Sequence, residues 1–170
     1  ELKLKMKYLQ GKVHTFDYGL STKLYNVNPG SIMPLGQEST VGGNVIPKER
    51  GWESALFISD DFNVNEKFAL NLGLRYSFFA TLGKSSQRTY ENDAPRSEST
   101  LLNIMQFDKN EIAKTYGGLE ARLGARYFLS PNFSVKGSYN NTLQYIHTLS
   151  NNTTASPTDT WKLSDLNIKP

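Results

Sequence analysis

One stretch, residues 114–147, constrains the fold more than any other part of the chain. From Leu119 to Leu129 every second residue is apolar or aromatic, and Glu120, Arg122 and Arg126 lie between them. Because side chains on a strand alternate between its two faces, this segment has one apolar face and one charged face. After a turn at residues 130–132 the alternation restarts and continues to Tyr145. The pattern predicts two antiparallel strands, near residues 114–129 and 132–147.

The same alternation recurs four times earlier in the chain, and it predicts strands near residues 1–9, 13–26, 52–64 and 67–83. Segments rich in Gly, Pro, Ser and Asn separate some of them and predict long loops near residues 27–51, 84–113 and 148–162. Asp60 falls on the apolar face of its strand. A β-bulge there, or a position at a membrane interface, would remove the cost of that placement.

Strand length and loop length together favour a membrane protein. Each clean alternation covers about 11–13 residues, which matches the ~9–11 that a tilted strand needs to cross a hydrocarbon layer. Short turns alternate with long loops, as they do at the two rims of an outer-membrane barrel. Aromatic residues gather toward strand ends, where they suit a lipid–water boundary. The chain is therefore predicted to be an all-β, antiparallel up-and-down transmembrane β-barrel segment in a Gram-negative outer membrane.

Six strands are too few to close a bacterial barrel, and unpaired strand edges in lipid leave backbone groups unsatisfied. The chain also begins in mid-strand and ends without a terminating element, so residues 1–170 are expected to be one internal section of a larger barrel domain. The charged face predicts a wide lumen that holds water or a folded plug. Its structural candidates are Arg75, Glu120, Arg122, Arg126 and Lys136. Glu120 with Arg122 and Arg126 is interpreted as an ion-pair ladder rather than an acid–base site.

The residues that carry most catalytic and metal chemistry are scarce. The chain has no Cys, and its two histidines, His14 and His147, are far apart in sequence. A metal site needs three or four converging ligands. Acidic and basic residues are interspersed, which argues against a nucleic-acid partner. No catalytic residue, metal ligand or cofactor is therefore expected, the chain is expected not to be an enzyme, and substrate-binding residues are unknown.

Several segments resemble the barrel of Bacteroidetes-type TonB-dependent outer-membrane receptors. They lie at residues 53–60, 72–77, 116–127, 134–140, 144–147, 149–151, 156–161 and 167–170. The resemblance covers about residues 52–170 well and the first fifty residues by pattern only. Family members often carry Pro where this chain has Ala121, which does not change the pattern of faces.

The resemblance implies a barrel of about 22 strands with an N-terminal plug, which imports a scarce nutrient with energy relayed through TonB. The implied partners are outer-membrane lipid, the plug and remaining barrel strands of the same protein, TonB through a part outside this chain, and a surface lipoprotein. No substrate contact carries over, because that family recognises its ligands with variable loops.

Two other classes remain open at this point. A soluble lipocalin-like or sandwich-like binding module would turn the leucine face inward. An outer-membrane β-barrel enzyme would need a converging triad, for which His147 near Ser150 and Asn151 is the candidate.

Overall fold

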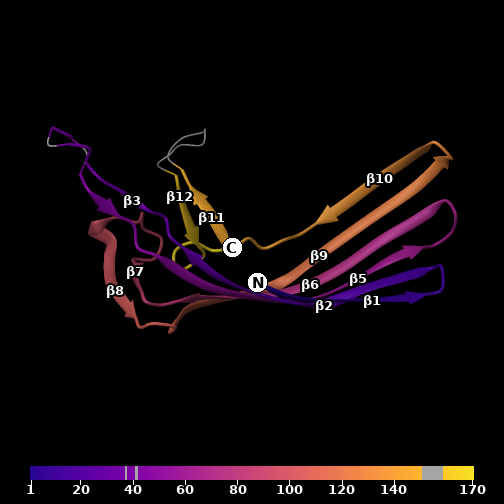
Figure 1. Cartoon of the computed structure of the whole chain (residues 1–170), viewed down its shortest axis with the longest axis horizontal. Coiled ribbons are helices and arrows are strands. Elements are labelled where there is room, and N and C mark those ends of the chain that lie inside the picture. Colours follow the sequence, from indigo (N-terminus) through magenta and orange to yellow (C-terminus); the bar gives the residue numbers. More distant parts are fainter. Residues whose placement is uncertain (37, 41, 151–158) are drawn as a thin grey trace. The chain divides into compact units, whose positions relative to one another are not determined.

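A computed structural model describes residues 1–36, 38–40, 42–150 and 159–170. Within these residues the chain forms a six-stranded antiparallel sheet, ordered β1-β2-β5-β6-β9-β10, and three two-stranded sheets. The strands of the large sheet are β1 (Leu2–Gln10), β2 (His14–Val27), β5 (Glu49–Asn63), β6 (Phe68–Leu82), β9 (Ile112–Ser130) and β10 (Phe133–Asn140). Figure 1 shows these strands side by side in that order. The prediction of an all-β antiparallel barrel segment is confirmed.

The short turns have clear local causes. Gly11 follows β1 with a φ of 64°, a left-handed backbone that glycine adopts without a steric penalty. Between β5 and β6, the Asn65 side-chain oxygen accepts hydrogen bonds from the backbone N–H groups of Lys67 and Phe68, both at 2.9 Å. These side-chain bonds add to the two backbone hydrogen bonds between Asn65 and Phe68 and stabilise the tight reversal. These turns set the register that keeps each apolar series on one face.

The chain divides into two compact units. The wall unit comprises residues 1–23, 53–79 and 117–143, and the loop unit comprises residues 24–52, 80–116 and 144–170. All three short turns of the large sheet belong to the wall unit, and its long connections fall mainly in the loop unit. The short turns and the long connections therefore belong largely to different compact units of the fold.

The long connections contain secondary structure that the sequence patterns did not predict. β3 (Ser31–Ile32) pairs with β4 (Asn44–Val45), and β7 (Ser85–Tyr90) pairs with β8 (Leu101–Phe107). A single 3-10 turn, η1 (Glu98–Thr100), precedes β8. In the described part of the chain, no helix is long and apolar enough to cross a membrane.

The strand predicted near residues 132–147 differs most from the structure. β10 ends at Asn140, and a separate strand, β11 (Ile146–Leu149), pairs with β12 (Thr160–Leu163). Tyr145, the last residue of the predicted alternation, is buried with 3% of its surface exposed. Alternation continued to Tyr145 in the sequence, but among the described residues the last backbone hydrogen bond from this segment to β9 runs from the N–H of Asn141 to the carbonyl oxygen of Ala121. The predicted loop at 148–162 lies partly outside the described residues, as do Asn151 and residues 156–158 of the resemblance.

Candidate functional site

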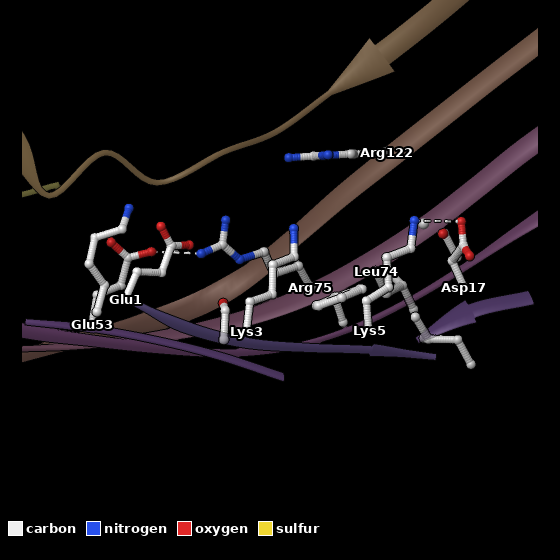
Figure 2. Close-up of a pocket in the computed structure, with 14 residues that line it drawn as sticks. Glu1, Lys3, Lys5, Asp17, Glu53, Leu74, Arg75 and Arg122 are labelled. Carbon is white, nitrogen blue, oxygen red and sulfur yellow. Dashed lines mark hydrogen bonds and ion pairs between the residues drawn. The ribbon is translucent and has the colours of Figure 1, made fainter. Parts of the chain in front are cut away.

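The polar face of the sheet in the wall unit carries a hollow of about 360 Å³. Side chains from β1, β2, β5, β6 and β9 line it. Figure 2 shows its labelled charged side chains rising from the same side of the strands. They are Glu1, Lys3, Lys5, Asp17, Glu53, Arg75 and Arg122. The strand alternation that placed charge on one face in the sequence is what gathers these residues here.

Two glycines make room for side chains that line this hollow. A Cβ on Gly19 would collide with the backbone oxygen of Leu4 and lie 3.0 Å from Cζ of Phe57. The missing side chain leaves room for the Phe57 ring, and the Lys3 ammonium lies 5.7 Å from the centre of that ring. A cation near an aromatic face is weakly stabilised there. Gly73 likewise lies between Ser59 and Arg122, whose Cβ atoms would each be 3.5 Å from a Cβ at that position.

Arg75 is the centre of the strongest ion pairing on this face. Its guanidinium lies 2.6 Å from Glu53 and 3.9 Å from Glu120, from the two strands that flank β6. The side chain of Glu120 is 2% exposed. Burying a carboxylate is costly unless a cation compensates its charge, and Arg75 offsets part of that cost for Glu120.

The other predicted lumen-facing residues do not join Glu120 in a ladder. Arg126 contacts Ser134 at 3.3 Å and stacks over the Phe128 ring at 4.3 Å, and Arg122 forms no ion pair with Glu120. The interpretation of Glu120, Arg122 and Arg126 as one ladder is therefore wrong. The strand alternation placed them on one face, but the partner of Glu120 comes from the neighbouring strand.

Arg126 and Lys136 lie directly opposite each other in the register of β9 and β10. Both side chains are exposed. Like charges directly opposite on neighbouring strands repel each other, and exposure to water reduces that cost. Arg126 and Lys136 border a second hollow, which Asp61 and Asn71 also line. Asn71 donates a hydrogen bond to Asp61, so the acid in this hollow already has a partner.

The opposite face of the wall unit is apolar and exposed. Leu72, Leu74 and Leu123 expose 39%, 49% and 48% of their surface, while Phe68 and Leu70 are half-buried. Exposed leucine, tyrosine and methionine side chains continue over β1, β2 and β5. No second sheet or helix packs on these side chains within the described residues of this unit. A soluble monomer rarely exposes so large a contiguous apolar surface.

Asp60, the one acidic fault in this apolar face, has a partner in the structure. Its carboxylate lies 2.7 Å from Nδ1 of His14. The His14 ring stacks on Phe62 with ring centres 4.3 Å apart and on Phe16 at 5.6 Å. The imidazole therefore makes a hydrogen bond to the carboxylate with one edge and stacks its ring faces on the two phenylalanines. The hydrogen bond to His14 therefore accounts for an acidic residue on the apolar face, and the alternation pattern alone did not identify this partner.

The loop unit holds a separate polar cluster around the segment 159–170. His147 Nε2 lies 2.9 Å from Oγ of Ser164, which is fully buried, and Tyr116 donates to the backbone oxygen of Asp165 at 2.5 Å. Lys162 pairs with Glu49 and, at 2.8 Å, with Asp165. Burial of the ammonium acts to lower the pKa of Lys162. Hydrogen bonds to Asp165 and Glu49 outweigh that effect and raise the pKa above its ordinary value.

The candidate triad of His147 with Ser150 and Asn151 stays a prediction that the described residues do not test. The described partner of His147 is Ser164, and Asn151 lies outside the described residues. Among the described side chains, no group of three or more His, Asp or Glu residues is arranged to hold a metal ion.

The large sheet of the wall unit has one exposed apolar face and one charged face. A family model described as an outer membrane beta barrel domain matches residues 13–165. The chain belongs to the outer membrane beta barrel domain family. This barrel domain is located in the outer membrane. No curated protein sequence and no solved structure matches the chain.

Family membership explains why the leucine face of the barrel segment is exposed. In a membrane barrel the outward face contacts lipid and the inward face contacts water or protein. The alternative of a soluble lipocalin-like or sandwich-like module is wrong, because that class would bury Leu72 and Leu74, which are exposed here.

Proposed function

We propose that this chain forms part of the wall of a TonB-dependent transporter that imports a scarce nutrient. The observation that carries the proposal is the charged face of the wall unit, with Arg75, Glu53 and Glu120 at its centre. A narrow barrel fills its interior with tightly packed side chains, whereas this face has a hollow lined by long charged residues. It suits a wide lumen that contains water or a folded plug.

Two further observations support a large barrel. β1 and β10 are the edges of the six-stranded sheet, and strand edges in lipid need partners. The segments at residues 53–60, 72–77 and 116–127 resemble TonB-dependent receptors. In this proposal the missing partners are strands of the same protein. A plug fills the lumen, TonB acts through a part outside this chain, and a surface lipoprotein meets the external loops.

Uptake experiments test this proposal. Cells with and without the gene are supplied with labelled nutrients, one at a time, at limiting concentration. The proposal expects that loss of the gene abolishes uptake of at least one nutrient, and that loss of TonB has the same effect. Uptake that continues unchanged without TonB would point instead to a passive channel.

We also propose that the chain contributes no catalytic group. His147 and Ser164 are close enough for proton transfer, but a fully buried hydroxyl cannot reach a substrate. Their hydrogen bond instead holds the segment 159–170 in the loop unit. Hydrolysis of a p-nitrophenyl ester by the purified protein, compared with the Ser164→Ala variant, tests this. Ester hydrolysis that disappears in the variant would restore the enzyme alternative.

A further inference from the structure

We propose that the hollow on the polar face binds a carboxylate group, held chiefly by Arg122 with Lys3. This inference deepens the proposed function, because it rests on that face lining the lumen. A carboxylate could arrive on a free ligand in the lumen or on an acidic side chain of the protein that fills it. The chemistry of recognition is the same in both cases.

The argument begins with the charges that line the hollow. Five are basic: Lys3, Lys5, Lys23, Arg75 and Arg122. Three are acidic: Glu1, Asp17 and Glu53. Basic side chains are therefore in excess at the rim of this concavity, and a concave surface of one sign concentrates ligands of the opposite sign.

Four of these eight charged side chains are held in ion pairs: Lys5, Asp17, Arg75 and Glu53. Lys5 lies 3.0 Å from Asp17, and Arg75 is shared between Glu53 and Glu120. Figure 2 shows both of these linked pairs in the hollow, with Arg122 standing apart from them.

Two cations remain available to a ligand. In the part of the chain that the structure describes, the side chain of Arg122 forms no hydrogen bond or ion pair, and the ammonium of Lys3 has the Phe57 ring as its one interaction partner. Arg122 is exposed on β9, and Gly73 beside it leaves its approach uncrowded. An arginine guanidinium presents two parallel N–H donors that match the two oxygens of a carboxylate. Lys3 adds a second charge, and Ser59 and Ser21 add hydroxyl donors from the same lining.

Glu1 allows a test in which a substitution is expected to strengthen carboxylate binding. Its carboxylate lines the same hollow and would repel an incoming anion. Replacing Glu1 by Gln removes the negative charge while keeping the size of the side chain. The Glu1→Gln variant is therefore expected to bind carboxylates more tightly, whereas loss of Arg122 weakens binding. A general loss of folding cannot produce both effects.

Isothermal titration calorimetry of the whole protein, purified in detergent at low salt, provides the measurement, with citrate as the probe. If the carboxylate comes from a free ligand, Arg122→Gln is expected to weaken citrate binding at least fivefold and Glu1→Gln to strengthen it. Arg126→Gln is the matched control. It removes the same charge from the same face of β9, four residues away and outside the hollow.

If an acidic side chain of the protein already occupies the hollow, citrate does not bind. Arg122→Gln then lowers the midpoint of thermal unfolding, and Arg126→Gln lowers it less. The inference is overturned if Arg122→Gln matches wild type in both measurements, or if the two arginine variants behave alike. Neither measurement depends on energised uptake. A protein that binds citrate but does not transport would overturn the transport proposal alone.

Discussion

In the wall unit Leu74 leaves 49% of its surface exposed, whereas Leu163 in the loop unit is fully buried. The wall unit exposes its leucines on one face and carries most of its charges on the other, where Arg75 pairs with Glu53 and Glu120. The loop unit buries Tyr145 and Leu163 beside polar groups of the same segment, such as Ser164 and Asp165. Lipid takes the place of a protein core in the first unit, and the second must build its own core. The two units should therefore respond differently to the same kind of substitution.

The largest expected effect comes from placing a charge on the lipid face of the wall unit. Leu72→Arg, or Leu123→Arg, should destabilise the barrel by about 2–4 kcal/mol near the middle of the bilayer, because the guanidinium must enter hydrocarbon. Asn71→Arg, one residue away on the opposite face, should cost much less. Unfolding in denaturant from lipid vesicles measures both. Equal losses at positions 71 and 72 would contradict the assignment of the faces.

A smaller loss is expected on the charged face itself. Arg75→Met removes the cation that lies beside Glu53 and buried Glu120. Breaking a fully buried pair costs about 3–5 kcal/mol, and the 29% exposure of the Arg75 side chain lowers the expectation to about 2–3 kcal/mol. The same unfolding experiment measures this. The double variant Arg75→Met with Glu120→Gln should recover part of the loss, since it removes the uncompensated buried charge.

The pair on the apolar face should behave as a coupled unit. His14→Leu leaves the Asp60 carboxylate without its partner and should cost about 1–3 kcal/mol. Adding Asp60→Leu removes the carboxylate that has lost its hydrogen-bond partner, and it should restore most of the stability in lipid. A double-mutant cycle measures the coupling. Independent, additive losses at the two positions would show that the 2.7 Å contact contributes nothing.

The smallest effect is expected in the loop unit and depends on pH. Because the folded state raises the pKa of Lys162, its ion pairs stabilise the fold fully below the ordinary lysine pKa of about 10.4. That contribution is lost as pH rises through the higher, folded-state pKa. The fluorescence of Trp161 in a Trp52→Phe background follows unfolding of this unit. Lys162→Met should be less stable at neutral pH and should show a weaker alkaline decline than the parent.

Much of the wall unit could be predicted from the sequence because the information is local. Alternation alone places the leucines of β6 on one face of the sheet and Arg75, Glu120 and Arg122 on the opposite face. Alternation does not predict which of those charges pair, because pairing depends on which residues of neighbouring strands lie opposite each other. Glu120 meets Arg75, and Asp60 meets His14, 46 residues away in sequence.

The loop unit was predicted less well for the same reason. Alternation predicted that the strand after Pro131 runs to residue 147, but the strand leaves the sheet after Asn140. The pairing of β7 with β8 and the burial of Tyr145 depend on contacts between distant segments. No local pattern marks Ser164 as the partner of His147.

By itself, the sequence determined that this chain makes long strands with one apolar and one charged face, because that property repeats every two residues along a single strand. Only the tertiary structure decided which charges neutralise one another and which, like Arg122, remain available. That outcome depends on register between strands, and a one-residue shift in register would change every pair.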